Sequence, residues 1–461
     1  MSLEKKAKIQ REGGIAYRMF KSYIRFVHDR MYYRHTYSLH TENIPAAGTP
    51  LMIVSNHQNC LNDPLGILMS IKDRKPYFIT RADVFAYHPV LNTFFRSIGL
   101  LPAFRIDYEG EDALKKNKDT FLMSANELIN GSTLMMFPEA GHQDKRWLGD
   151  FSYGYTKMVF EAAELDDFQT EIFILPACNH YSDYFRIQEQ MLIKYGTPVS
   201  IKPFYGLYKT KPRTAQRQVS ALIRKQIEDL MLNIRDLDHY EAIDFIRNTY
   251  GKKFAEQNQF DAEKLPERLL SDRLLVASLE KIKANSHEEV LTGIYTDALT
   301  LKKGIAEMKI NDSLFERCPS WCAVIGCLLL LLAGLPLWVF SLWPNALHLI
   351  APNILINRMT DKMFYGTFIL ALSILITIPL FYALTFVLTW IYASVWLALI
   401  YLALLPCLGL FAWYYRKFFI QTMQALRFRI KCKTAIIQNL KYLRTTVYDR
   451  LNDLLICKSK E

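Results

Sequence analysis

The most informative stretch of this sequence is Leu51-Met-Ile-Val-Ser-Asn-His-Gln-Asn-Cys-Leu-Asn-Asp-Pro64. Its apolar start, residues 51–54, predicts a buried strand, and the second apolar run, which follows Pro64, predicts a helix. Asp63 is suited to cap this helix, and Pro64 is suited to its first turn. His57 is therefore expected on the loop between the strand and the helix.

His57 and Asp63 are six positions apart. On one continuous helix this offset corresponds to about 240° of rotation, so the two side chains would point apart. They can meet only if the loop folds back onto the start of the helix. A pair that meets is a general base oriented by a carboxylate; otherwise Asp63 is a cap with an unrelated histidine nearby. Cys60 suggests a nucleophile, but a small apolar filler is the simpler interpretation.

Short apolar runs alternate with helical patterns through residues 36–203. The expected strands lie at 36–39, 51–54, 76–80, 133–137, 172–175 and 199–201, and the expected helices at 89–98 and 111–129. Such alternation predicts an α/β domain in which helices flank a mixed sheet. Residues 204–318 carry many charges at helical spacing, and they predict an α-helical extension that contains no site.

The C-terminal half contains long segments without charge. The chain has 461 residues and a formal net charge of +11, yet no Asp, Glu, Lys or Arg occurs at 318–357 or 363–415. A membrane-spanning helix needs ~20 apolar residues, so the second segment has room for two. We expect a membrane domain of C-terminal transmembrane helices at 319–415. It would hold a hairpin at 365–415 and a segment at 320–343, interrupted by Gly334-Leu-Pro336, that spans or re-enters.

The charge distribution predicts the location of the chain. Basic residues follow the hairpin in a tail at 416–461, which we expect to be cytoplasmic. The start of the sequence is charged and unlike a secretory signal, so the folded domain is expected on the cytoplasmic face of the cytoplasmic (inner) membrane. An even number of crossings is then required, and we prefer two, with 320–343 re-entrant or interfacial. No nucleic-acid motif occurs, which argues against that partner.

Residues 1–35 contain a basic amphipathic helix. Ile15, Met19 and Phe26 fall at helical spacing, with Arg18 and Arg25 among the intervening positions. This pattern predicts a helix that lies in the headgroup region of a lipid bilayer. A helix packed on the folded domain is the alternative, and the two are compatible.

The segment Asn56-His-Gln-Asn-Cys-Leu-Asn-Asp63 resembles the first sequence block of the glycerolipid, or lysophospholipid-type, acyltransferases. The common block has four residues between its histidine and its aspartate. This chain has five, with Asn62 at the usual place of the carboxylate. The longer His-x5-Asp spacing is similar to that of fungal sn-1 glycerol-3-phosphate acyltransferases and many bacterial membrane-bound homologues. The resemblance implies that His57 and Asp63 are the catalytic pair.

Three later segments follow the block order of the same family. Gly99-Leu-Leu-Pro-Ala-Phe-Arg105 is similar to the second block and Leu175-Pro-Ala-Cys-Asn-His180 to the fourth. Phe137-Pro-Glu-Ala-Gly141 resembles the third block, with Ala140 where glycine is usual. The resemblance covers residues 36–203, and it implies a glycerol-3-phosphate acyltransferase-like mixed sheet.

The resemblance also implies how substrate is bound. Arg105, with Lys145 or Arg146, would hold the acceptor phosphate, because a guanidinium donates two charge-assisted hydrogen bonds at once. Glu139 would orient the glycerol or that arginine. The implied substrate-binding set is Gly99, Arg105, Phe137, Pro138, Glu139, Gly141 and Arg146.

The implied function is that of a membrane-bound O-acyltransferase of phospholipid biosynthesis. It would move a fatty acyl group from an acyl carrier protein or coenzyme A thioester, its co-substrate, to the hydroxyl of lysophosphatidate (1-acyl-sn-glycerol-3-phosphate). Acylation of glycerol-3-phosphate at sn-1, O-acylation of an amino-acid-containing lyso-lipid, and a non-catalytic lipid-binding role are alternatives. The expected partners are the lipid bilayer, the thioester and the acceptor. The eight cysteines form no metal motif, and no metal or cofactor is expected.

Overall fold

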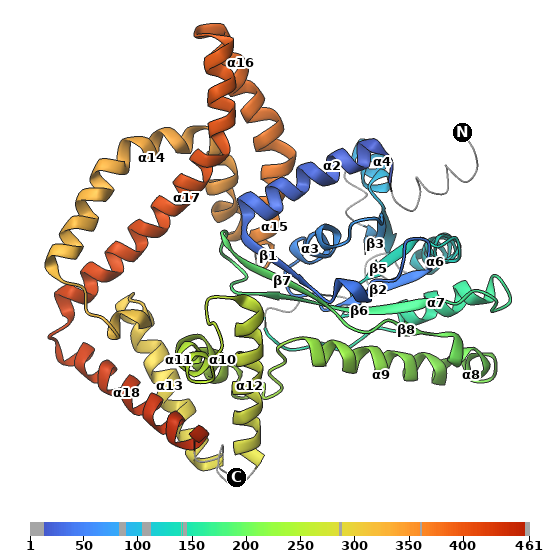
Figure 1. Cartoon of the computed structure of the whole chain (residues 1–461), viewed down its shortest axis with the longest axis horizontal. Coiled ribbons are helices and arrows are strands. Elements are labelled where there is room, and N and C mark those ends of the chain that lie inside the picture. Colours follow the sequence, from blue (N-terminus) through green and yellow to red (C-terminus); the bar gives the residue numbers. More distant parts are fainter. Residues whose placement is uncertain are drawn as a thin grey trace. The chain divides into compact units, whose positions relative to one another are not determined.

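The computed structural model describes residues 13–82, 89–103, 112–139, 141, 145–284, 288–359 and 362–456 (Figure 1). The chain divides into two compact units. The first consists of Met1–Asn233 with Met359–Leu370, and the second of Ile234–Arg358 with Ala371–Glu461.

The first unit is built on a mixed sheet that has eight strands in the described residues. These are β1 (Tyr33–Leu39), β2 (Leu51–Ser55), β3 (Pro76–Arg81), β4 (Leu100–Ala103), β5 (Thr133–Met136), β6 (Phe173–Tyr181), β7 (Glu189–Tyr195) and β8 (Val199–Ser200). The order is β1-β7-β6-β2-β5-β3-β4, with β8 paired to β6. β6 is antiparallel to β7 and β8, and the other pairs are parallel. The predicted fold class is confirmed.

Two of the strands are not among those expected from the sequence. β7 mixes charged and apolar residues, and β4 is short and contains Pro102. Neither therefore has the continuous apolar run that identifies a buried strand. β7 lies between the distant β1 and the preceding strand β6, and β4 lies at the sheet edge beside the preceding strand β3.

Helices cover both faces of this sheet. They include α3 (Asn62–Ser70), α4 (Pro89–Ser97), α6 (Asp112–Ile129), α7 (Gly154–Glu164), α8 (Tyr205–Thr210) and α9 (Pro212–Leu230). Figure 1 shows α3 on one face and α7 and α9 on the other. On the α3 face, Gly66 packs so closely on β7 that an added Cβ would overlap Met191.

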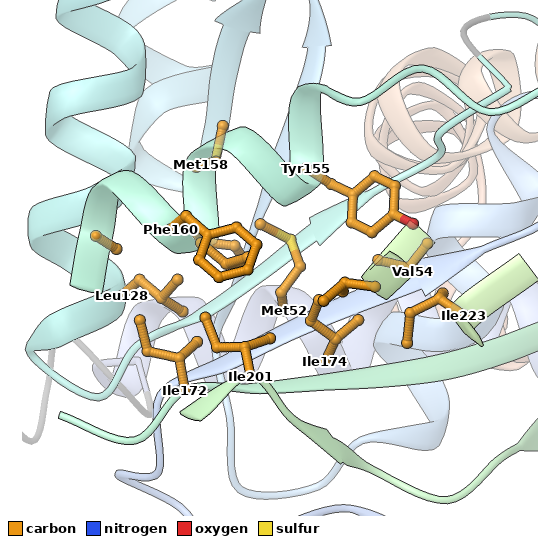
Figure 2. Packing of buried hydrophobic residues seen from close by; sticks show 14 of the residues in the cluster. Met52, Val54, Leu128, Tyr155, Met158, Phe160, Ile172, Ile174, Ile201 and Ile223 are labelled. Atoms are coloured by element: carbon orange, nitrogen blue, oxygen red, sulfur yellow. The ribbon is translucent and has the colours of Figure 1, made fainter. Parts of the chain in front are cut away.

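The main core lies between the sheet and helices α6, α7 and α9. Met52 and Val54 of β2 are fully buried there with Phe160 of α7 and Ile223 of α9 (Figure 2). Burying an apolar side chain of this size contributes roughly 1.5–3 kcal/mol, so β2 is strongly held. Because α8 and α9 belong to this core, the helical extension begins after Asn233 and not at residue 204.

The N-terminal helix α2 (Ile15–Phe26) packs on the end of α3. Lys21 Nζ donates a hydrogen bond to the Ile71 carbonyl at 2.5 Å, and Arg25 donates to the Met69 carbonyl at 2.7 Å. Cations are favourable at a helix C-terminus, where carbonyl groups lack partners. A π-helical turn, Val27–Tyr32, then leads into β1.

The second unit is helical. It contains α10 (Tyr240–Thr249), α11 (Gly251–Gln257), α12 (Leu265–Ala284), α13 (Glu288–Met308), α14 (Trp321–Ile356), α16 (Ala383–Tyr392), α17 (Val395–Lys431) and α18 (Ala435–Ile456). The basic tail does not stand alone, because Arg444 and Arg450 of α18 form ion pairs with Asp312 and Asp297 of the extension.

Three helices in the described residues are long and apolar enough to cross a membrane: Trp321–Ile356, Phe364–Tyr392 and Val395–Lys431. The last two cover residues 365–415, where the sequence predicts a hairpin, and Ser394 caps Val395–Lys431 by accepting a hydrogen bond from the Leu397 amide. The first is longer than the segment 320–343 expected from the sequence. It continues as a helix through Pro336, Pro344 and Pro352. The structure therefore has three candidate spans in the described residues, whereas the sequence favoured two.

Candidate active site

The loop between β2 and α3 folds back on itself. Cys60 adopts a left-handed backbone conformation with φ of 40°, and the Asn62 amide donates to the Asn59 carbonyl at 2.8 Å. α3 therefore begins at Asn62, which places Asp63 in its first turn. Asp63 is not the cap that the sequence predicted; its carboxylate points back into the loop.

This fold brings His57 and Asp63 together. His57 Nδ1 lies 2.7 Å from Asp63 Oδ2, with the aspartate fully buried and the histidine side chain 20% exposed. The imidazole also stacks on Phe137, with ring centroids 4.3 Å apart. A carboxylate at Nδ1 selects the tautomer that carries its proton there and leaves Nε2 as the basic nitrogen.

Asp63 holds the loop as well as the histidine. Its Oδ2 also accepts the amide N–H groups of Gln58 and Asn59, each at 2.7 Å, and its Oδ1 accepts the Tyr181 hydroxyl at 2.5 Å. Hydrogen bonds to an ionised carboxylate are about twice as strong as neutral ones. One buried carboxylate thus fixes both the loop backbone and the imidazole.

Glu139 anchors the other side of the same loop. Its Oε1 accepts the His57 amide and its Oε2 accepts the Gly149 amide, both at 2.7 Å. Burial raises the pKa of Glu139 to about 7. The two hydrogen bonds from backbone amides lower this pKa, but burial has the larger effect. Both carboxylate oxygens accept backbone amides, and the substrate contact that the sequence resemblance implied for Glu139 stays a prediction.

Comparison with known proteins gives a match at this site. Residues 37–179 match a family model described as Acyltransferase. They form an acyltransferase domain. Among solved structures, the chain is similar to one described as the 1-acyl-sn-glycerophosphate (LPA) acyltransferase, PlsC, from Thermotoga maritima, at 16% identity and a TM-score of 0.36, over 50% of this chain and 83% of that chain. A comparison with curated proteins finds no match.

The acyltransferase domain encloses Arg146, which the sequence indicated as a phosphate ligand. The residue is only 4% exposed. It donates to the Tyr181 carbonyl at 3.0 Å, and its guanidinium lies 4.9 Å from the centre of the Tyr184 ring. Arg146 therefore supports the strand that carries Tyr181, and Arg105 lies outside the described residues.

The remaining predicted residues of the domain lie at turns. Gly99 has a φ of 95°, and an added Cβ would lie 2.8 Å from the Pro76 carbonyl, so only glycine fits between β3 and β4. The Pro138 carbonyl accepts the Ser152 amide at 2.8 Å. Gly141 is exposed and open. Within the described ranges, no group of three or more His, Cys, Asp or Glu side chains is placed to hold a metal ion.

Among the residues that reach the catalytic loop, Tyr181 and Thr367 were not predicted from the sequence. Tyr181, at the end of β6, contacts Asp63 from 118 positions away. Thr367 belongs to the short segment Met359–Leu370 of the same unit, and its Oγ1 accepts the Leu61 amide at 3.1 Å. Next to it, Gly366 leaves no room for a Cβ beside Tyr32 and Asn62. No sequence pattern around Tyr181 or Thr367 predicts these contacts.

Proposed function

We propose that the protein is a membrane-bound O-acyltransferase of phospholipid biosynthesis. It transfers a fatty acyl group from an acyl carrier protein or coenzyme A thioester to the free hydroxyl of lysophosphatidate. The observation that carries this proposal is the imidazole of His57, oriented by Asp63 at 2.7 Å within an acyltransferase domain. The three apolar helices support a membrane location.

In the proposed mechanism His57 Nε2 takes the proton of the acceptor hydroxyl. The oxygen attacks the thioester carbonyl, and a tetrahedral oxyanion forms. When the carbon–sulfur bond breaks, the thiolate takes the proton from the imidazolium, and ester and thiol leave. General-base catalysis of this kind contributes roughly 10²- to 10⁴-fold, and Asp63 stabilises the transient imidazolium.

The loop amides have other partners in this conformation. The amide of His57 donates to Glu139, those of Gln58 and Asn59 donate to Asp63, and that of Leu61 donates to Thr367. These four amides are therefore not free to stabilise the oxyanion in this conformation. Arg105 is the proposed ligand of the acceptor phosphate, from its place in the sequence.

Acyl transfer by purified protein in neutral detergent tests the proposal. A labelled acyl thioester is offered with lysophosphatidate, glycerol-3-phosphate or a lyso-amino-acid lipid in parallel. We expect ester formation with lysophosphatidate, lost about 10²- to 10⁴-fold in His57→Ala. His40→Asn, at an exposed histidine on another loop, serves as control and should retain the rate.

Two results would contradict the proposal. Equal turnover by His57→Ala and wild type would exclude His57 as the base. If only glycerol-3-phosphate or the lyso-amino-acid lipid is acylated, the protein is an acyltransferase, but lysophosphatidate is not its acceptor.

A further inference from the structure

We propose that the N-terminal part of the chain contains a binding pocket for the phosphate headgroup of an anionic phospholipid, separate from the acyl-transfer site. The pocket has a volume of about 450 Å³, and its lining residues belong to α2, the π-helical turn and β1. All of its lining residues fall between positions 22 and 36. None of them takes part in the proposed mechanism.

The pocket is strongly basic. Arg25, Arg30 and Arg34 line it, together with a single carboxylate, that of Asp29. Asp29 already has a partner, because His28 Nδ1 lies 2.6 Å from its Oδ1. In the described part of the chain, none of the three arginines forms an ion pair with a carboxylate. With three arginines and one aspartate, the pocket has a net charge of +2, which favours an anionic ligand.

Phosphate suits these donors. Guanidinium groups bind phosphate oxygens through two parallel hydrogen bonds, and Ser22 and Thr36, which also line the pocket, supply hydroxyl donors. Arg25 is held in place by its hydrogen bond to the Met69 carbonyl, which uses one of its five N–H groups. Arg30 and Arg34 are exposed and remain for the ligand.

The surroundings favour a lipid over free phosphate. Ile15, Met19 and Phe26 of α2 are 81%, 69% and 46% exposed, and their spacing places them on one face of the helix. Phe26 also lines the pocket, so this apolar face leads directly to the arginines. A helix of this kind buries its apolar face among acyl chains while basic side chains meet anionic headgroups.

Binding of short-chain lipids to the full chain in neutral detergent tests this inference. The probes are dihexanoyl phosphatidylglycerol, dihexanoyl phosphatidylcholine and inorganic phosphate, with affinity measured by calorimetry. We expect phosphatidylglycerol to bind more tightly than the other two. The double variant Arg30→Gln/Arg34→Gln should weaken that binding about tenfold or more, because two charge-assisted contacts are lost.

A matched control is available on α9. Arg213 and Arg217 are also exposed and four positions apart, so Arg213→Gln/Arg217→Gln removes the same charge elsewhere. This control should bind phosphatidylglycerol like wild type. An equal loss in both double variants, or equal binding of the two lipids, would overturn the proposal. Binding of inorganic phosphate as tight as that of phosphatidylglycerol would replace the lipid by free phosphate. His57→Ala should leave lipid binding intact, which separates this inference from the acyl-transfer proposal.

Discussion

At the scale of single residues, Tyr181 extends the catalytic pair by one group. Its hydroxyl donates to Asp63 Oδ1 at 2.5 Å, on the side of the carboxylate away from His57. Removing it leaves a buried carboxylate oxygen without this donor, which raises the free energy of the charged form. The donor positions Asp63 and does not touch the reacting atoms.

We predict that Tyr181→Phe lowers kcat for acyl transfer roughly tenfold with little change in KM, since a hydrogen bond to a charged group contributes about 1.5–3 kcal/mol. Tyr195→Phe is the matched control, because that buried hydroxyl contacts Ser70 and not Asp63. Steady-state kinetics of both variants decide the matter. Equal kcat for Tyr181→Phe and wild type would remove Tyr181 from the site.

Glu139 gives a prediction about pH. Burial raises its pKa from 4.5 to about 7, so the folded chain binds this proton more tightly than the unfolded chain. Protonation of Glu139 therefore stabilises the folded state. This stabilisation is fully present below about pH 4.5, and it is lost as the pH rises through about 7. The melting temperature of wild type should therefore fall between about pH 5 and pH 7.5 relative to that of Glu139→Gln, which cannot titrate.

Thermal unfolding in detergent, followed by intrinsic fluorescence across this range, measures the difference. Glu164→Gln, at an exposed glutamate of α7, should keep the slope of wild type. Parallel curves for all three proteins would show that Glu139 has an ordinary pKa.

The sequence predicted His57 and Asp63 because both lie in one short loop whose flanking strand and helix have clear patterns. Arg146 contacts the Tyr181 carbonyl, and the Tyr181 hydroxyl contacts Asp63, because β6 lies beside β2. The hydrophobic periodicity of single segments does not predict this order of strands. The same holds for Glu139, whose partners are backbone amides of two separate loops.

At the scale of elements, the helix that begins at Phe364 contacts the catalytic loop through its first turns. Thr367 Oγ1 accepts the Leu61 amide from 306 positions away, and Gly366, Ile369 and Leu370 are buried. The sequence predicted this helix as half of a membrane hairpin, since its composition is apolar throughout. Composition does not reveal that its first turns pack on the acyltransferase domain.

We predict that Thr367→Val lowers kcat about three- to tenfold, because the Leu61 amide loses a partner worth about 0.5–1.5 kcal/mol and the loop loosens. Thr367→Ser should restore the rate, which a purely steric role would not require. Thr385→Val is the control, since Thr385 lies on the same span and its hydroxyl donates to the Phe381 carbonyl of its own helix. Equal activity of Thr367→Val and wild type would exclude a positioning role.

At the scale of the whole chain, three observations bear on how the apolar helices cross a membrane. No candidate span precedes Trp321 in the described residues. We therefore expect residue 318 to lie on the same side of a membrane as the acyltransferase domain. Residues 359–370 belong to the same unit as that domain. The tail packs on the extension through Arg444 and Asp312, so we expect residue 434 on the same side as residue 318.

These expectations require an even number of crossings on each side of residue 359. In the arrangement that we predict, the helices Phe364–Tyr392 and Val395–Lys431 cross as a hairpin, whereas α14 begins and ends on one side. Its 36 residues span roughly 54 Å as a helix, well beyond a hydrocarbon core of about 30 Å. Three internal prolines remove backbone hydrogen bonds and favour bending, and Figure 1 shows α14 as a curved helix.

We predict that both ends of α14 are accessible from the same side of a sealed membrane vesicle. Reporter cysteines, used one at a time after the other accessible cysteines are replaced by alanine, are treated with a membrane-impermeant thiol reagent. The reporters are Cys318, Asn357→Cys, Ala393→Cys and Thr434→Cys, all at exposed positions. Cys318 and the positions 357 and 434 should react from one side, and position 393, at the hairpin tip, from the other. Opposite sidedness of 318 and 357 would make α14 a full crossing, and the contact between Thr367 and the catalytic loop could not then exist in the membrane.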